Sequence, residues 1–226
     1  MQVEIVHGPG NAAARVKLAL NETMTAEAGA MIAMNSHITM TTTTHKKKKG
    51  GLLKAAKRLL AGESLFLNHY ETHGQPGEVI LAATLSGDMM EYDLNDEMLI
   101  VQSGSFVACE HQVDMDLGWQ GFKSILSGES VFWLKMTGTG KVVLSSYGAI
   151  YPVDVDGEYI VDTGHIVAFN ETLDFDITKA GKSLIGSFLG GEGLVCRFKG
   201  RGRVWCQSHN PSGLGKVLGP MLRPRS

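Results

Sequence analysis

The sequence predicts an all-β protein built from three tandem β modules with pseudo-threefold order, joined by short helices. Three observations support this prediction. Glycine is abundant (28 residues) and proline is scarce (6), as expected for tight turns between strands. Two blocks of sequence each occur three times. Short runs that alternate apolar and polar residues follow one of these blocks.

The first block begins with a helix-like segment and a glycine–glutamate pair. The helices are expected near residues 51–60, 119–126 and 182–189. Each pair precedes a β-prone run, a glycine turn and a second β-prone run, so GESVFWLKMTGTGKVVLSSYG is interpreted as two strands joined by a tight turn. The glutamates are Glu63, Glu129 and Glu192, which lie 66 (129−63) and 63 (192−129) residues apart. Because they recur in every module, a structural role at a turn is favoured over catalysis.

The second block aligns through three glycines: Gly29, Gly104 and Gly164. An alanine follows four residues later in each copy, at Ala33, Ala108 and Ala168. Apolar residues then alternate with polar ones, as in VDMD and LDFD, which predicts strands with one buried face and solvent-facing aspartates. We expect the three glycines to occupy a common turn, at positive φ or where another backbone approaches closely.

The order of the blocks predicts one domain, residues 1–226, with circularly offset repeats. The first repeat starts with its second block, so residues 1–45 are expected to complete a unit with residues 180–212. The other units span approximately 50–116 and 117–179. Short strands with glycine turns in three units indicate a closed or nearly closed β architecture.

Charge and cysteine content exclude several classes of protein. The formal net charge is −2, which gives no global basic field for nucleic acid, so nucleic acid is an unlikely partner. The three cysteines are an odd and sparse set and are expected to be free thiols. Neither a signal peptide nor a long apolar span is recognisable, so a cytoplasmic location is expected.

The motifs together resemble the altered inheritance of mitochondria protein 24 family. The resemblance rests on GGLLKAAKRLLAGESLFLN, WQGFKSILSGESVFWLKMTGTGKVVLSSYGAI, VDTGHIVAF and QSHNP, and it runs along nearly the whole chain. It implies three modules similar to the trp RNA-binding attenuation protein, within the double-stranded β-helix class. It supplies no catalytic residues. A mitochondrial branch of that family is linked to inner-membrane organisation, but this chain lacks an Arg- and Ser-rich transit peptide.

No catalytic, metal or cofactor site is predicted from the motifs. His69 and His73 lie four residues apart, ~13 Å along a strand, which is too far for one metal ion unless the chain turns between them. The segment LSSYGA contains Ser145 and Ser146, but it lacks the G-x-S-x-G pattern of a nucleophile elbow. It is interpreted as a strand end and turn.

One basic segment is not explained by the repeat. The aligned alanine and glutamate are 30 residues apart in the first copy but 21 and 24 in the others, so the first copy contains an insertion. The insertion and the following helix carry seven cations, which are Lys46, Lys47, Lys48, Lys49, Lys54, Lys57 and Arg58. They are weak candidates for contact with an anionic membrane or an acidic partner. The alternative is a solvated loop that only aids solubility.

Two functional hypotheses follow. The first is a non-enzymatic β scaffold that forms homo-oligomers and binds a protein partner or a membrane surface. The second is a small-molecule-binding or enzymatic β-helix protein with its site between modules. A deep pocket in which polar side chains from different units converge would favour the second hypothesis, whereas a core filled by apolar side chains would favour the first.

Overall fold

The computed structural model describes residues 1–44, 66–116, 133–179 and 194–222. Most of these residues lie in antiparallel strands, which confirms the all-β prediction. The strands form a four-stranded sheet ordered β1-β2-β7-β4 and a larger sheet ordered β12-β15-β13-β8-β11-β9-β3-β6-β5, with β10 on β11 and β14 on β15. Within the described ranges, no helix is long and apolar enough to cross a membrane.

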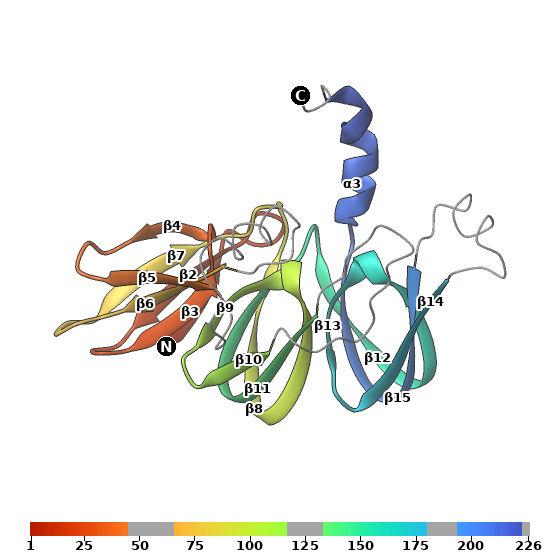
Figure 1. Cartoon of the computed structure of the whole chain (residues 1–226), viewed down its shortest axis with the longest axis horizontal. Helices are drawn as coiled ribbons and strands as arrows, with labels where there is room; N and C mark the ends of the chain where they lie inside the picture. Colours follow the sequence, from red (N-terminus) through yellow and green to blue (C-terminus); the bar gives the residue numbers. More distant parts are fainter. Residues whose placement is uncertain (45–65, 117–132, 180–193, 223–226) are drawn as a thin grey trace.

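The strands follow one another along the molecule as three groups, which form a row in Figure 1. The N-terminal strand group contains β1 (Gln2–Val6), β2 (Ala13–Leu18), β3 (Thr23–Glu27), β4 (Met31–Met34), β5 (Thr39–Thr44), β6 (Phe66–Glu71) and β7 (Gly77–Leu81). The middle strand group contains β8 (Met89–Gln102), β9 (Phe106–Glu110), β10 (Val113–Asp116) and β11 (Trp133–Ser145). The C-terminal strand group contains β12 (Ile150–Asp162), β13 (Ile166–Asn170), β14 (Leu173–Lys179) and β15 (Leu194–Gln207).

The middle and C-terminal strand groups have the same internal pairing. In each, two long strands pair along their whole length, β8 with β11 and β12 with β15. The two short strands then pair with the far side of the second long strand, as β9 and β10 do with β11. The N-terminal strand group pairs β3 with β6, β2 with β7, β5 with β6 and β4 with β7. The arrangement is therefore the same, except that β2 and β3 together replace the first long strand and β6 and β7 together replace the second. Strand β1 is an addition that pairs with β2.

Two strand pairs join neighbouring groups. Strand β9 of the middle strand group pairs with β3, where Ala108 faces Ala26. Strand β13 of the C-terminal strand group pairs with β8, where Ala168 faces Val101. We call these two pairs the junctions. The two junctions use equivalent residues. Ala26 and Val101 each lie three residues before an aligned glycine, and each faces the aligned alanine of the next group.

The predicted glycine turn of the middle copy is wrong. The segment WLKMTGTGKVVLS is one continuous strand, β11, which pairs with β8 on both sides of Gly138. Gly138 and Gly140 have positive φ, and the register shifts by one residue beside them, so these glycines bend the strand without ending it. Strand β15 likewise continues through Gly200. Figure 1 shows these long strands strongly curved.

The strand pairing also differs from the predicted unit boundaries. Strand β15, within the predicted span 180–212, pairs with β12, β13 and β14 and not with the N-terminal residues. The additional strand β1 pairs with β2 instead. The pairing therefore follows chain order, because β11 pairs with β8 and β15 pairs with β12, the long strand that precedes each of them in the sequence. The helices predicted near residues 51–60, 119–126 and 182–189 lie outside the described residues.

A side-chain bond to the backbone occurs at the same place in all three groups. Asn35 accepts from the Glu78 amide at 2.7 Å, and Glu110 accepts from the Lys141 amide at 2.9 Å. In the C-terminal strand group, Asn170 accepts from an amide at 3.0 Å, that of Arg203. Each acceptor is the last residue of a short strand or the residue directly after it, and each donor follows a glycine. The bond supplies an acceptor to an amide beside the bend of the long strand.

Those three glycines carry a steric requirement that the sequence analysis did not identify. A Cβ atom on Gly77 would lie 2.8 Å from Ile38, and on Gly140 it would lie 2.7 Å from Glu110 and 3.1 Å from Val113. The third position is Gly202, where a Cβ atom would lie 2.9 Å from Leu173. Ile38, Val113 and Leu173 are the first buried residues of the predicted alternating runs. Glycine therefore lets these side chains pack directly on the long strand.

The core consists of three apolar clusters that follow the strand groups. The N-terminal cluster is rich in alanine, valine and methionine. The C-terminal cluster has packed aromatic rings, with Phe169 centred 4.9 Å from Phe175 and 5.0 Å from Phe198. All three cysteines are free, as predicted, and all three are buried; burial raises the pKa of Cys109 to about 12. The helix α3 (Pro211–Leu218) and the turn η3 (Gly219–Met221) extend away from the strands (Figure 1).

Candidate functional site

A cavity of about 410 Å³ lies where strand ends from all three groups meet. It is bordered by the ends of β3, β8, β11 and β15 and by Pro211 at the start of α3. Its polar lining residues are Glu27, Thr84, Gln102, Ser103, Ser145, Ser146, Tyr147 and Gln207. The volume falls in the range of small-molecule sites, ~300–1,000 Å³.

Three polar side chains around this cavity, those of Ser145, Ser146 and Gln207, are bonded to nearby backbone. Gln207 accepts from the Tyr147 amide at 2.8 Å and donates to the Gly164 carbonyl at 2.9 Å. Ser146 donates to the Gly148 carbonyl at 2.7 Å. Ser145 lies 3.5 Å from the Ser105 carbonyl. The bond between Gln207 and the Tyr147 amide connects the end of β15 to the segment that follows β11.

Ser145 and Ser146 of LSSYGA do not form a catalytic triad with the nearby His165 and Asp162. His165 donates from Nδ1 to the Gln207 carbonyl at 2.8 Å. Asp162 accepts from the Gly164 amide at 2.8 Å and caps the short η2 turn (Thr163–His165). Ser145 and Ser146 donate to carbonyl groups. Each side chain therefore makes a structural bond at a strand end, which agrees with the interpretation of LSSYGA as a strand end and turn.

Glu27 supplies the carboxyl group of this cavity. Burial raises the pKa of its carboxyl group to about 7, because desolvation disfavours the charged form. Glu27 lies two residues before Gly29, and Gln102 and Asp162 take the same place before Gly104 and Gly164. The alignment therefore contained a signal for this position, which the sequence analysis missed. A carboxyl group that titrates near neutral pH can accept or donate a proton to a bound ligand.

The two histidines considered as metal ligands have separate surroundings. His69 on β6 lies 2.9 Å from the Thr25 hydroxyl and 2.7 Å from the Thr43 hydroxyl. Burial, with a smaller effect of His111, lowers the pKa of His69. His73 lies 3.8 Å from Glu71. Among the described residues, no three His, Cys, Asp or Glu side chains are grouped suitably for a metal ion.

The other predicted site residues divide into two sets. The basic residues Lys46–Lys49, Lys54, Lys57 and Arg58 and the glutamates Glu63, Glu129 and Glu192 lie outside the described residues. Gly29, Gly104 and Gly164 do share a turn before a short strand, but only Gly29 has positive φ, at 96°. Gly104 and Gly164 lie in single 3-10 turns, which need no such φ. The expected common backbone conformation is therefore wrong.

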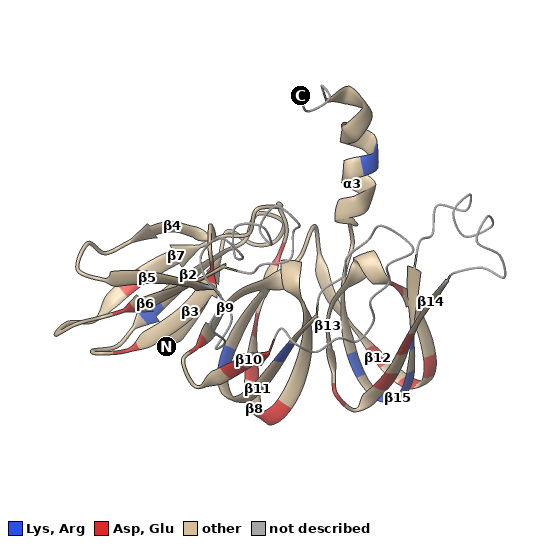
Figure 2. Ribbon diagram, viewed as in Figure 1, with Lys and Arg blue, Asp and Glu red and all other residues tan. Residues whose placement is uncertain are grey.

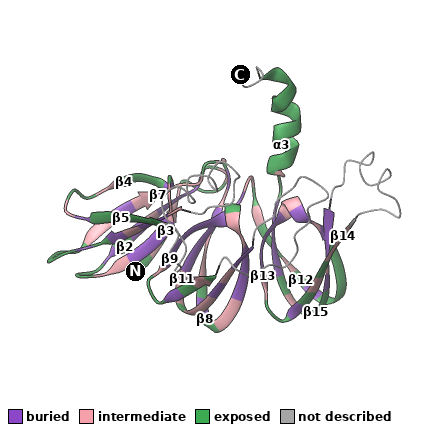
Figure 3. Ribbon diagram, viewed as in Figure 1, coloured by how far each residue is buried: buried purple, intermediate pink, exposed green. Residues whose placement is uncertain are grey.

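Exposed apolar side chains lie on β4, on β12 and on the C-terminal helix. Figure 3 colours most of α3 as exposed. On β4, Met31 is 36% and Ile32 59% exposed, and on β12, Tyr159 is 46% and Ile160 51% exposed. The end of the chain exposes Val217, Leu218, Met221 and Leu222. Figure 2 shows no charged residue on β4 and a single cation, Lys216, on α3. Such uncovered apolar edges are typical of binding surfaces.

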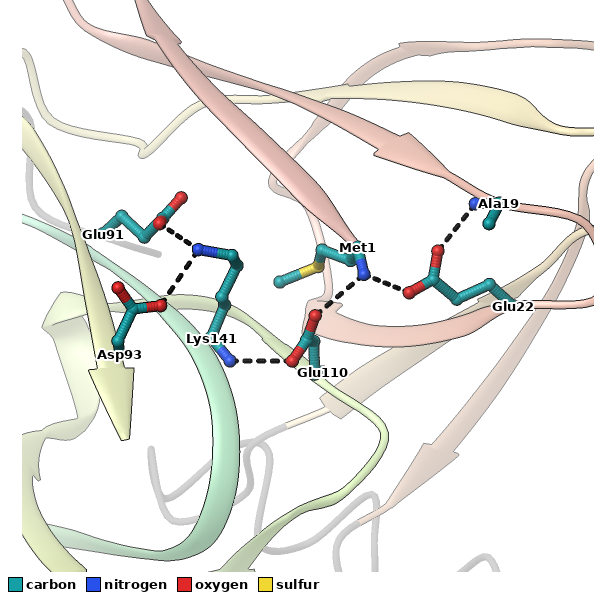
Figure 4. A network of polar contacts seen from close by, with 7 residues as sticks. All are labelled: Met1, Ala19, Glu22, Glu91, Asp93, Glu110 and Lys141. Carbon is teal, nitrogen blue, oxygen red and sulfur yellow. Dashed lines mark hydrogen bonds and ion pairs between the residues drawn. The ribbon is translucent and has the colours of Figure 1, made fainter. Parts of the chain in front are cut away.

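A network of charges connects the N-terminal and middle strand groups (Figure 4). The amino group of Met1 is paired with Glu22 and lies 2.8 Å from Glu110. Burial alone would lower the pKa of this amino group, but hydrogen bonds to Glu110 and Glu22 raise it overall. Lys141 is paired with Glu91 and lies 2.9 Å from Asp93. The network fixes one group against the other and leaves no reactive group free among the residues in Figure 4.

Comparisons with known proteins agree with this geometry. A family model described as mitochondrial biogenesis AIM24 matches residues 3–209. An uncharacterised protein of Streptococcus pyogenes serotype M6 is 27% identical over 188 residues, which cover 80% of this chain and 75% of that protein. A crystal structure of a Streptococcus pyogenes protein, determined by structural genomics, superposes with a TM-score of 0.82 at 24% identity. It covers 98% of this chain and 99% of its own, and at this identity it shows the fold alone.

Proposed function

This chain belongs to the mitochondrial biogenesis AIM24 family, and from that premise we propose that it is a non-enzymatic β scaffold. In this proposal the protein associates with further copies of itself and presents a surface to a protein partner or a membrane. The observation that carries the proposal is the placement of exposed apolar side chains on the edges of β4 and β12 and on α3, outside three well-filled cores.

The scaffold is proposed to consist of three modules with pseudo-threefold order, of the kind found in double-stranded β-helix and trp RNA-binding attenuation protein-like folds. The shared pairing of the three strand groups supports this. So does the bond that Asn35, Glu110 and Asn170 each make to an amide beside the bend. A module that contacts only its neighbours leaves one edge open at each end of the row.

Sedimentation or light scattering tests the self-association. We expect the purified chain to form a homo-oligomer at micromolar concentration, because exposed apolar strand edges favour pairing. A strict monomer at 100 times that concentration would contradict self-association. The assembly is expected to persist at high salt, since apolar contacts and backbone hydrogen bonds are screened less than exposed charge pairs.

Contact with a membrane or an acidic partner is a separate part of the proposal. It rests on the basic residues Lys46–Lys49 and on the exposed apolar side chains of α3. Binding to vesicles with anionic lipid should exceed binding to neutral vesicles and should weaken with added salt. Changing the four lysines to glutamine should abolish that difference. Equal binding by wild type and the glutamine variant would leave the lysines a solubilising role.

The cavity around Glu27 favours a second candidate function, the binding of a small polar ligand. Polar side chains from all three groups border this cavity, and one of them titrates near neutral pH. A thermal-stability screen against small amines and carboxylates, at pH 6 and pH 8, would test it. A ligand that raises the melting temperature of wild type but not of Glu27→Gln would support a site there. The absence of any such difference would leave the cavity a structural gap between strand ends.

A further inference from the structure

We propose that the free edge of β12 in one copy pairs with the free edge of β4 in a second copy, in the register that the two junctions already use. The inference rests on the proposed self-association and names its surface. Strand β4 lies at one end of the four-stranded sheet and β12 at one end of the larger sheet. Figure 1 shows them at opposite ends of the row of strand groups.

The first support is a difference in burial at equivalent positions. Ile160 on β12 is 51% exposed, whereas Ile100, its equivalent on β8, is 2% exposed because β13 covers it. Tyr159 is 46% exposed, whereas its equivalent Leu99 is fully buried. The end of the row therefore exposes the same apolar positions that a junction buries.

The opposite end shows the same difference. Ile32 on β4 is 59% exposed, whereas its equivalents Val107 on β9 and Val167 on β13 are 1% and 0% exposed. Met31 is 36% exposed, and its equivalent Phe106 is fully buried. Strand β4 thus has the composition of a junction strand, but no strand among the described residues takes the place of the neighbour that a junction provides.

Other sheet edges do not fit the proposal. Strands β5, β10 and β14 take the same outer place in the three groups, and none of them is covered by a second strand among the described residues. Strand β1, at the other end of the four-stranded sheet, has no equivalent strand in the other two groups. Apart from Met40 on β5, which is 41% exposed, the exposed positions of β5, β10 and β14 are polar or charged, as in TMTTTT, VDMD and LDFDITK, which is the usual protection of a sheet edge. Strand β4, with sequence MIAM, has no such protection.

The junctions specify the register of the new pair. Ala26 faces Ala108 and Val101 faces Ala168, so Val161 should face Ala33 of the next copy. Met34 should then face Ile160, and the two strands should run antiparallel, as in both junctions. The contact is heterologous, because each copy contributes two different edges. It therefore generates a closed ring of two or more copies or an open filament of whole chains.

Cysteine cross-linking tests the register. Met34→Cys and Ile160→Cys are made in separate chains, which are mixed and oxidised mildly. The paired Cβ atoms would lie ~5 Å apart, within reach of a disulfide. The matched control mixes Met34→Cys with Asp156→Cys, which lies four residues away on the same strand, ~13 Å along it. We expect at least tenfold more cross-linked dimer from the first mixture than from the control.

Charge substitution provides a second, independent measurement. Ile160→Lys should weaken association at least tenfold, because the junction geometry would bury the lysine without a partner. Tyr151→Lys on the same strand, where wild-type exposure is similar at 45%, should leave association unchanged. Adding Met34→Glu to Ile160→Lys should restore association, since the two new charges would face each other between copies. Both substituted residues are partly or largely exposed in one chain, so the variants should fold.

The outcomes separate this inference from the proposed function. A monomeric wild type would overturn both. An oligomer that is insensitive to Ile160→Lys and gives equal cross-linking in both mixtures would overturn the edge pairing and leave self-association through another surface. A chain carrying both cysteines that forms its disulfide only internally, as a monomer, would show that the row closes on itself and would also overturn the inference.

Discussion

Strands β13 and β4 have the same place in their groups but different surroundings. Both follow an aligned glycine, and both pair with the second half of the next long strand. Strand β13 is also covered by β8, and its Phe169 is 1% exposed. Strand β4 has no second neighbour within the described residues, and its Ile32 is 59% exposed. A neighbouring strand therefore determines burial here, because IVAFN and MIAMN are both apolar.

The largest expected effect separates these two strands directly. Phe169→Ala should destabilise the protein by ~3–5 kcal/mol, because it removes a ring packed among Trp133, Phe175 and Phe198. Met34→Ala, at the equivalent place on β4, should cost less than ~1 kcal/mol when measured on the dissociated chain. Chemical unfolding followed by tryptophan fluorescence gives both values. Equal losses would mean that β4 is as well covered as β13.

Much of the strand pattern was predictable from the sequence. The three alternating runs were correctly predicted as strands with a buried face, since Val113 and Leu173 are buried and Asp114 and Asp174 are exposed. Period-two alternation depends on one strand and one covered face, which is local information. Met40 departs from the pattern, at 41% exposed, because β5 is the last strand of its sheet.

The pairing of the long strands was not predictable in the same way. A glycine between two β-prone runs is compatible with a hairpin turn or with a bend in one strand. The structure has a bend, because β8 pairs with β11 on both sides of Gly138. That choice depends on a partner more than 30 residues away, which is nonlocal information. The cavity is missed for the same reason, since its lining residues come from four strand ends.

A second prediction compares two glycines, one between strand groups and one in an exposed turn. Gly87 lies in the segment that links the N-terminal and middle strand groups, and a Cβ atom there would lie 1.9 Å from the Ser146 carbonyl oxygen. Gly87→Ala should therefore cost ~2–4 kcal/mol, because backbone on both sides must move. Gly104→Ala should stay within ~0.5 kcal/mol, since nothing lies within 4 Å of its added Cβ atom.

This expectation replaces the sequence-based view that Gly104 is sterically required. The melting temperatures of the two variants measure the difference. A destabilised Gly104→Ala together with an unchanged Gly87→Ala would reverse the comparison. The glycines that do meet close neighbours in all three groups are Gly77, Gly140 and Gly202. Their signal was present in the sequence, because each precedes the aligned runs EVIL, KVVL and RVWC.

A third prediction concerns the pH dependence of stability and compares Glu27, on β3 at a junction, with Asp162, the equivalent residue on β12 at the end of the row. Burial raises the pKa of Glu27 from 4.5 to about 7, so between these values the folded state binds more protons than the unfolded state. Stability should therefore fall as the pH rises from ~4.5 to ~7, by on the order of 2 kcal/mol. Glu27→Gln should remove this loss, because its side chain carries no charge to desolvate. Asp162, the equivalent residue on β12, instead accepts from the Gly164 amide at 2.8 Å.

Urea unfolding at pH 5, 6, 7 and 8 gives this pH dependence. Subtracting the unfolding free energy of Glu27→Gln from that of wild type at each pH separates the contribution of this carboxyl group from those of other titrating groups. A difference that does not change with pH would show that the Glu27 carboxyl group is better hydrated than its position indicates. A larger effect in an assembled sample than in a dissociated one would place an additional contact near this junction.

The smallest expected effect concerns the side-chain bond that Asn35 and Asn170 each make to a backbone amide. It tests whether this hydrogen bond contributes the same stability inside the row of strand groups as at its end. Asn170→Ala removes the acceptor of the Arg203 amide and should cost ~1 kcal/mol, a usual net value for one hydrogen bond. Asn35→Ala removes the equivalent acceptor of the Glu78 amide, but Asn35 is exposed, so water can replace it. We expect Asn35→Ala to lose less than half as much stability as Asn170→Ala.

Assembly should change this comparison. If β4 is covered by a second copy, the stability lost in Asn35→Ala should approach that lost in Asn170→Ala in the assembled protein. The measurement is therefore made at two protein concentrations, and an Asn35 effect that is large and independent of concentration would contradict an open end of the row.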